Sequence, residues 1–276
     1  MGERRHPGKR GEIKIARHRV DWSGGRVVGL RLRRYRSSLE GGRYRFSRRI
    51  SFASARSFDR VKFVVTAGPT REPIDPVRFI SNRSSGKMGY AIAKAALELD
   101  HQVILISGPV GLAAPAGAEL IRVITSDEMD DAVQEAVRDC DVLVMCAAVS
   151  DYKPARIAEQ KLKKGDEKFS LDLVPARDIL KSLPLSRNFF VVGFAAETKE
   201  LEAHARAKLA TKNCDMIVAN DLSDPKIGIE SDENAVTIFS RNGETEKISR
   251  TSKNIIAQQL VKIIRANAKK VLTKNF

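Results

Sequence analysis

The segment Ser84-Ser85-Gly86-Lys87-Met88-Gly89 carries residue types that bind anions. It begins an amphipathic helix predicted over Lys87–Leu99, behind a polar loop and an apolar strand predicted over Val61–Thr66. Backbone N–H groups at a helix N-terminus lack intrahelical partners, and the helix dipole favours negative charge there. Met88 stands where a P-loop needs Ser or Thr, and no G-x-G-x-x-G sequence follows the strand. The segment therefore predicts an anion site of a less common type.

The end of a second predicted strand offers another ligand surface. Strand Asp141–Cys146 runs into Ala147-Ala148-Val149-Ser150-Asp151-Tyr152, whose first side chains are small enough to let a flat ligand approach the backbone. Asp151 could bind a hydroxyl group or a magnesium ion, and it could equally cap a turn. The residue pattern alone leaves both interpretations open.

Three further features suit a phosphorylated ligand, and each also has an ordinary structural explanation. The charged loop Glu159–Asp166 is either a solvated surface loop or a mobile lid that carries a lysine to the ligand. Phe194, after the predicted strand Phe189–Gly193, could stack on a base. Lys208 and Lys212 share one face of a helix predicted over residues 199–212, where they bind a polyphosphate or simply face solvent.

The elements that must position these residues alternate between strand and helix. Further strands are predicted over Gln102–Ser107 and Asp215–Ala219, and Thr125 with Glu128 forms a capping-box pattern before a helix that ends near Asp139. Two strands around Asn242-Gly243, over residues 235–239 and 246–249, form a hairpin, and a last helix spans residues 252–268. Apolar strands separated by helices predict a three-layer Rossmann-like α/β fold. Its mostly parallel sheet has helices on both faces and a C-terminal β-hairpin plus helix, and ligands bind at the carboxyl ends of the strands.

Charge divides the chain into two parts. Residues 1–60 hold 18 Lys and Arg against 5 Asp and Glu, a net charge of +13, which leaves +2 for residues 61–276. We expect residues 1–60 to be a mostly disordered basic leader. It is an organellar transit peptide, a basic arm for RNA or membrane, or a segment upstream of the true start codon. Residues 61–276 suit one domain with a full core.

Two further composition signals favour a cytoplasmic location. The sequence has no run of 18 apolar residues, so no membrane span is predicted. Cys140, Cys146 and Cys214 lack C-x-x-C spacing and are predicted to be small buried apolar residues in a reducing compartment.

Six blocks occur together and in order, at residues 66–78, 81–89, 147–152, 161–164, 193–198 and 219–221. This combination closely resembles phosphopantothenate–cysteine ligase, an enzyme of coenzyme A synthesis, over about residues 61–265. In many bacteria this ligase is fused behind a flavin-dependent decarboxylase, and the chain resembles the stand-alone form. The Ser84–Gly89 block resembles the bacterial branch, which uses CTP rather than ATP.

The resemblance implies a reaction in two halves. The carboxylate of 4'-phosphopantothenate attacks the α-phosphate of CTP, with Mg²⁺, to give an acyl-cytidylate and pyrophosphate, and the amine of L-cysteine then attacks the acyl carbon. By position, Asn82 matches the asparagine that handles the acyl-cytidylate, and Lys161 matches a flap lysine. The CTP-binding positions correspond to Met145, Cys146, Ala147, Asp151, Lys161, Arg177, Asp178, Ile179, Leu180, Phe194, Lys208 and Lys212. No metal ligand from the protein is assigned.

Departures from the family pattern leave some roles open. Arg177 replaces Pro in a Pro-Asp-Ile segment, and Gln160 stands where Glu is expected. The resemblance also implies a homodimer with phosphopantothenate near the subunit interface, to which the hairpin at residues 235–249 could contribute.

Two other classes of function compete with a ligase. A Rossmann-like oxidoreductase or epimerase needs a glycine fingerprint and a Tyr-x-x-x-Lys pair, and we expect neither in this chain. A basic RNA-binding protein with an α/β domain would explain the total charge of +15, but the basic residues are concentrated in residues 1–60. Nucleic acid is therefore expected to bind only non-specifically, through that leader.

Overall fold

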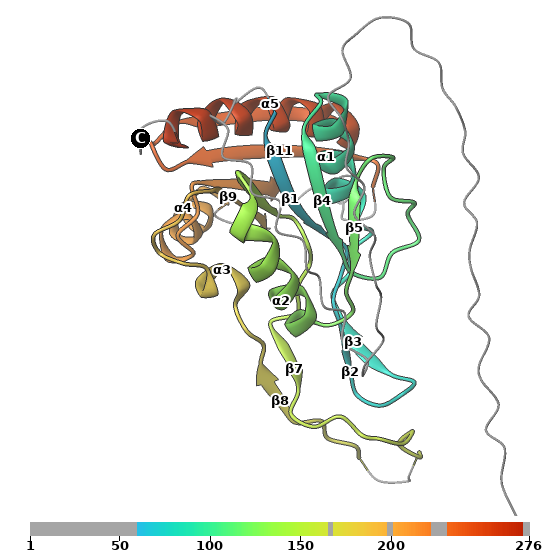
Figure 1. The fold of residues 1–276 in the computed structure, drawn as a ribbon. Coiled ribbons are helices and arrows are strands. Elements are labelled where there is room, and N and C mark those ends of the chain that lie inside the picture. The colour runs from blue at the N-terminus through green and yellow to red at the C-terminus, as the bar shows by residue number, and fades with distance from the viewer. Residues whose placement is uncertain (1–59, 165–167, 198–200, 222–230, 273–276) are drawn as a thin grey trace, which may run out of the picture. The chain divides into compact units, whose positions relative to one another are not determined.

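The structure is a computed structural model that describes residues 60–164, 168–197, 201–221 and 231–272 (Figure 1). The predicted basic leader lies outside the described residues, apart from Arg60. Among the described residues, no helix is both long enough and apolar enough to cross a membrane.

An eight-stranded sheet forms the centre of the fold, in the order β12-β11-β10-β9-β6-β1-β4-β5. Six strands run parallel and two antiparallel strands extend one edge, so the predicted mostly parallel sheet and its C-terminal hairpin are confirmed. The strands are β1 (Lys62–Ala67), β4 (Gln102–Ser107), β5 (Glu119–Arg122), β6 (Val142–Met145), β9 (Phe190–Glu197), β10 (Met216–Asp221), β11 (Glu233–Ser240) and β12 (Thr245–Ser252).

Helices cover both faces of this sheet, which confirms the predicted three layers. On one face, α1 (Lys87–Glu98) packs beside α5 (Lys253–Leu272) (Figure 1). The other face holds α2 (Ser126–Ala136), the 3₁₀ helix η1 (Val137–Asp139), α3 (Ile179–Ser182) and α4 (Leu201–Thr211). Successive residues of β1 alternate between the two cores, because Phe63 and Val65 face α1 while Val64 faces α2.

The predicted capping box at the start of α2 is confirmed with one shift. Thr125 Oγ1 accepts a hydrogen bond from the backbone N–H of Glu128 at 3.2 Å. In return, Glu128 Oε2 accepts one from the backbone N–H of Ile124 at 2.7 Å, one residue upstream of the usual partner. Both contacts satisfy N–H groups that the helix itself leaves unpaired.

Two short hairpins replace segments that the sequence predicted as loops. β2 (Arg71–Pro73) pairs with β3 (Phe79–Ser81), and β7 (Tyr152–Pro154) pairs with β8 (Leu173–Pro175). Strands of three residues are too short to give a periodic signal, which is why the sequence did not reveal them. Asp75 closes the first hairpin, since its Oδ1 accepts hydrogen bonds from the backbone N–H groups of Val77 and Arg78 at 2.8 Å each.

Candidate functional site

The carboxyl ends of β1 and β6 lie side by side, at the point where the strand order of the sheet changes direction. From β1 the chain continues to β4 on one side, whereas β6 leads to β9 and β10 on the other. Such a point opens a crevice at the carboxyl ends of the strands. Thr66 Oγ1 links the ends of these two strands, because it accepts hydrogen bonds from the N–H groups of Cys146 and Ala147 at 3.1 Å each. The N–H of Ala148 donates to the carbonyl of Gly68 at 2.9 Å.

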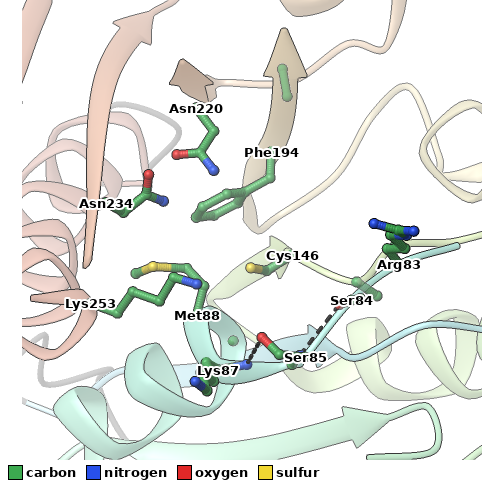
Figure 2. Close-up of a pocket in the computed structure, with 15 residues that line it drawn as sticks. Arg83, Ser84, Ser85, Lys87, Met88, Cys146, Phe194, Asn220, Asn234 and Lys253 are labelled. Atoms are coloured by element: carbon green, nitrogen blue, oxygen red, sulfur yellow. Dashed lines mark hydrogen bonds between the residues drawn. The ribbon is translucent and has the colours of Figure 1, made fainter. Parts of the chain in front are cut away.

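A small cavity of about 170 Å³ lies between the β6 exit and the start of α1 (Figure 2). We name it the helix-end cavity. Its walls come from the β3–α1 loop, the exits of β6, β9 and β10, the start of β11 and the first residue of α5. The lining residues are Arg83, Ser84, Ser85, Gly86, Lys87, Met88, Gly89, Cys146, Ala147, Ala148, Phe194, Ala195, Asn220, Asn234 and Lys253.

The start of α1 has the geometry that the sequence predicted. Gly86 is the N-cap residue with φ of +74°, a left-handed conformation that a residue with a side chain rarely adopts. A Cβ atom at Gly89 would lie 2.6 Å from Ala67 Cβ, so glycine lets α1 approach β1. Ser84 Oγ accepts a hydrogen bond from the N–H of Gly86 at 3.3 Å. The first turn of α1 thus opens on the cavity, and it contains no acidic residue.

Burial shifts the ionisation of two groups in the helix-end cavity. Burial raises the pKa of the Cys146 thiol to about 12, so this residue is a neutral part of the wall. Burial, followed by the positive charge of Lys87, lowers the pKa of Lys253. Lys87 Nζ itself lies 2.6 Å from Asp232 Oδ1. The predicted burial of the cysteines is confirmed for Cys140 and Cys214, while Cys146 is partly exposed in the cavity.

A second cavity of about 390 Å³ adjoins the first, and we name it the strand-exit cavity. It lies under the exits of β6 and β9, between α3 and α4. Ala147 and Phe194 line both cavities and so form the wall between them. The structure brings ten of the predicted CTP-binding residues together around the strand-exit cavity: Met145, Ala147, Asp151, Arg177, Asp178, Ile179, Leu180, Phe194, Lys208 and Lys212. Cys146 belongs to the helix-end cavity instead.

Charged contacts hold the far wall of the strand-exit cavity. Asp178 caps α3 by accepting a hydrogen bond from the N–H of Lys181 at 3.3 Å, and it forms an ion pair with Lys212. Arg177 Nη1 lies 2.9 Å from Asp130 Oδ2. The Asp130 side chain is 1 % exposed, and this hydrogen bond raises the pKa of Arg177. Arg177, which departs from the family pattern, therefore ties the loop before α3 to α2.

Asn82 and Lys161, the two residues assigned to catalysis by resemblance, do not line either cavity. Asn82 Nδ2 donates a hydrogen bond to the carbonyl oxygen of Val149 at 2.9 Å, which places it beside the β6 exit. Lys161 is exposed in the segment after β7. The structure thus leaves Lys161 apart from the other predicted residues.

The residue after Lys161 is anchored at its backbone. Leu162 N–H donates to Asp75 Oδ2 at 3.1 Å, and Leu162 O accepts from Arg78 Nη2 at 2.6 Å. The hydrogen bond from the Arg78 side chain holds the pKa of Asp75 well below its usual range. The predicted flap is therefore attached to the β2–β3 hairpin at its start.

Sequence reasoning missed three polar residues of the helix-end cavity. Asn220 belongs to the block at residues 219–221 without an assigned role, and no sequence pattern points to Asn234 or Lys253. Asn220 Oδ1 is buried and has no hydrogen-bond partner among the described residues. The three residues come from β10, β11 and α5, so only the folded chain brings them together.

The alternative of an oxidoreductase finds no support in the folded chain. The expectation that the chain lacks a Tyr-x-x-x-Lys pair is wrong, because Tyr90 and Lys94 have this spacing. However, Tyr90 is buried with its hydroxyl 3.0 Å from Ser107 Oγ, and Lys94 Nζ lies 3.8 Å from Glu98 on the exposed side of α1. The spacing therefore arises from core packing and surface charge on one helix.

Comparisons with known proteins agree on one family. Residues 58–267 match the family described as DNA/pantothenate metabolism flavoprotein C-terminal domain. The "Coenzyme A biosynthesis bifunctional protein CoaBC" of Vibrio vulnificus is 46 % identical over 205 residues, which cover 73 % of this chain and 51 % of the relative. The protein of the same description from Bacillus subtilis is 46 % identical over 208 residues, 75 % of this chain and 51 % of the relative. The chain thus spans about half the length of these curated relatives.

Solved structures share the fold. A crystal structure of the C-terminal domain of a CoaBC protein is 37 % identical, with a TM-score of 0.66 over 78 % of this chain and 100 % of that chain. The DNA/pantothenate metabolism flavoprotein from Streptococcus pneumoniae is 25 % identical, with a TM-score of 0.62 over 75 % of this chain and 99 % of that chain. A mutant of Cab2 in complex with phosphopantothenate-cysteine is 17 % identical with a TM-score of 0.66 over 79 % of this chain and 89 % of that chain, a likeness of fold.

Proposed function

Because the chain belongs to the family of DNA/pantothenate metabolism flavoprotein C-terminal domains, we propose that it is a CTP-dependent phosphopantothenate–cysteine ligase. It would join 4'-phosphopantothenate to L-cysteine through an acyl-cytidylate, with release of pyrophosphate and then CMP. One observation carries the proposal: ten residues assigned to CTP by resemblance line a single cavity, which adjoins the cavity at the N-terminus of α1. The stand-alone form, residues 61–276 as the ligase domain and a cytoplasmic location remain predictions.

The two cavities suggest how CTP is divided between them. The strand-exit cavity, with Phe194 and the α3 loop, suits the cytidine. The helix-end cavity suits the phosphates, because N–H groups of α1 and lysine side chains favour negative charge there. The α-phosphate would then lie near Ala147, at the wall that both cavities share.

The first half-reaction needs the carboxylate of phosphopantothenate close to the α-phosphate. Asn82 is held beside Val149, next to the shared wall, and its amide can donate to an oxygen of the acyl-cytidylate. Lys161 would move toward this point when substrates bind. The protein supplies orientation and neutralises charge, which is how such group transfers are accelerated.

Magnesium fits this arrangement as an ion carried mainly by the nucleotide. The described residues contain no cluster of three His, Cys, Asp or Glu that could hold a metal ion by itself. Mg²⁺ usually retains waters and binds substrate phosphates plus one or two carboxylates. Asp151 in the strand-exit cavity is the carboxylate we assign to it, and the ion would supply further charge neutralisation on the phosphates.

Dimerisation through the two small hairpins is the arrangement that the exposed side chains favour. Large apolar residues are exposed on these hairpins and beside them: Val77, Phe79, Tyr152, Ile157, Leu173 and Val174. The β11–β12 hairpin, suggested by the sequence, exposes mainly polar residues on β12. Since β7 follows directly after Asp151, such an interface would lie near the strand-exit cavity.

A pyrophosphate-release assay tests the proposed function. The full chain is incubated with CTP, Mg²⁺ and phosphopantothenate, with and without cysteine. We expect pyrophosphate release that requires phosphopantothenate, and the mass of phosphopantothenoylcysteine when cysteine is present. ATP should be used far less well, because polar groups that pair with the cytosine edge are left unpaired by adenine. Equal specificity constants for ATP and CTP would contradict the nucleotide choice, and absence of release would contradict the function.

A further inference from the structure

Lys253 occupies an unusual place in the helix-end cavity. It is the first residue of the 20-residue helix α5 and is 6 % exposed. Its backbone N–H donates to the carbonyl of Asp232 at 2.9 Å. Its side chain and that of Met88, in the first turn of α1, line the same cavity (Figure 2). The first residue of one helix and the first turn of another therefore share a cavity, and Lys87 is close enough to Lys253 to affect its charge.

This placement is unfavourable for the folded chain by itself. An ammonium group loses hydration when it is buried. A positive charge at the N-terminus of a helix opposes the helix dipole. Lys87 adds repulsion, which together with burial favours the neutral form of Lys253, although Asp232 opposes this in part. A residue that breaks several local rules at once is expected at functional sites.

The surroundings of Lys253 select a compact anion. Among the described residues, the lining of the helix-end cavity contains no Asp or Glu. It does contain the N-terminal N–H groups of α1 and the amides of Asn220 and Asn234. At about 170 Å³ the cavity is too small for a nucleoside and its phosphates together, and the larger strand-exit cavity adjoins it.

We propose that Lys253 binds the β- and γ-phosphates of CTP and stabilises the pyrophosphate that leaves in the first half-reaction. This inference rests on the proposed ligase function. A carboxylate oxygen of phosphopantothenate forms a bond to the α-phosphorus, and the bond from that phosphorus to the bridging oxygen breaks. The electron pair stays on the departing pyrophosphate. Lys253 donates N–H hydrogen bonds to its oxygens, and no proton needs to be transferred.

The inference separates the two half-reactions. When the cysteine amine attacks the acyl carbon, CMP leaves and pyrophosphate takes no part. Lys253 therefore acts in the first half-reaction alone. A residue that merely supported the fold would affect both halves together.

The test replaces Lys253 by Met in the full chain, with Lys262→Met as the matched control on an exposed position of the same helix. Pyrophosphate release in a single turnover should fall by about 10²–10³, the usual cost of one donor to developing charge. Transfer from separately prepared acyl-cytidylate to cysteine should stay within about threefold of the unmodified chain, because that step does not use the pyrophosphate subsite. Circular dichroism and the melting temperature without nucleotide should show that both variants are folded before their rates are compared.

A variant that retains the positive charge shows whether the charge of Lys253 or the shape of its side chain matters. Lys253→Arg should retain most pyrophosphate release, and inorganic pyrophosphate should inhibit the unmodified chain at least about tenfold more strongly than Lys253→Met. Unchanged release in Lys253→Met, or an equal loss in both half-reactions, would overturn the role of Lys253. If the unmodified chain releases no pyrophosphate, the proposed function itself is wrong, and the two failures are thereby distinguished.

Discussion

The side-chain amide of Asn82 lies 2.9 Å from the backbone carbonyl oxygen of Val149 and donates a hydrogen bond to it. This contact joins the loop after β3 to the loop after β6, beside the wall shared by the two cavities. Asn82→Asp replaces the donor with a carboxylate that faces a carbonyl oxygen and, in the proposed binding mode, the phosphates of the nucleotide. We expect pyrophosphate release to continue while transfer to cysteine slows by about 10²–10³. Mass spectrometry should then find accumulated acyl-cytidylate.

Asn242→Asp is a suitable control for that change. Asn242 lies in the β11–β12 turn, where its Oδ1 accepts a hydrogen bond that a carboxylate can also accept. This variant should behave as the unmodified chain in both half-reactions. Absence of acyl-cytidylate in the Asn82 variant would show that its assigned role is wrong.

The attachment of the flap can be released at Asp75. Asp75→Asn removes the charge that pairs with Arg78 and weakens the anchor at Leu162. Trypsin should then cut after Lys161, Lys163 or Lys164 faster than in the unmodified chain, whereas CTP with phosphopantothenate should slow cleavage in the latter. Because the pKa of Asp75 is lowered, the anchor should persist at every pH above the ordinary range of an aspartate and weaken only in stronger acid. Ligand-independent cleavage would mean that this segment is a plain surface loop.

Lys161→Gln tests the same segment without disturbing its anchor. The side chain is exposed, so the melting temperature should change little. We expect most ligase activity to be lost, because a charge carried to the substrates is missing. Full ligase activity in Lys161→Gln would contradict a role for Lys161 in the reaction.

Gly108 is a position where no side chain fits. A Cβ atom there would lie 1.8 Å from the carbonyl oxygen of Pro69, and Pro69 forms a bridge with Ala148 in the shared wall region. Gly108→Ala should therefore destabilise the chain by at least about 1–3 kcal/mol and displace the wall, with loss of activity. Gly111→Ala is the control, since its Cβ would meet nothing within 4 Å. Chemical denaturation compares the two, and equal stability would contradict the packing argument.

His101 gives the chain a pH dependence in mild acid. It is 2 % exposed, its Nδ1 accepts a hydrogen bond from the N–H of Val61 at 3.3 Å, and its ring stacks on Phe63. Burial, followed by the positive charge of Arg265, lowers the pKa of His101 in the folded state. The unfolded chain therefore takes up a proton first as pH falls, and stability is full above about pH 6.5.

Below that pH the free energy of unfolding should fall, with a slope of at most about 1.4 kcal/mol per pH unit for one proton. Urea denaturation between pH 5 and pH 8 measures this slope, and His101→Asn should reduce it. A slope that is the same in both chains would place the titrating group elsewhere.

Residues 61–276 should fold and act without the basic leader. All eight strands of the large sheet come from residues 62–252, and β1 is already flanked by β4 and β6. We expect this fragment to be soluble, to run as a dimer by light scattering and to keep full ligase activity. Its affinity for heparin should vanish, because the net charge falls from +15 to +2. An insoluble or inactive fragment would show that the leader is part of the enzyme.

The sequence predicted the large sheet well because its central strands are solidly apolar. β1, β4, β6, β9 and β10 are buried between two helical layers and therefore stand out as apolar runs. β5 escaped notice because it is a partly exposed edge strand of four residues. The two small hairpins escaped because three residues establish no period.

The site was predictable where one loop carries the signal and not where several elements converge. The start of α1 could be predicted from Gly86 and from Ser84 and Ser85 before it. The residues around the strand-exit cavity were assigned to CTP through family resemblance rather than from their spacing. The contact of Arg177 with Asp130, and the approach of Lys253 to α1, join residues far apart in the chain. No local pattern encodes such distances.

The shared wall formed by Ala147 and Phe194 has a consequence for inhibitor design. A single compound could place a heterocycle in the strand-exit cavity and a pyrophosphate mimic in the helix-end cavity. Since the cavities adjoin, the connecting atoms could be few and stiff, so binding at one end would present the other at high effective concentration. Such a compound would be selective for proteins that have both cavities side by side. A protein with only one of the cavities would bind only one half of the compound, so the other half would add no affinity.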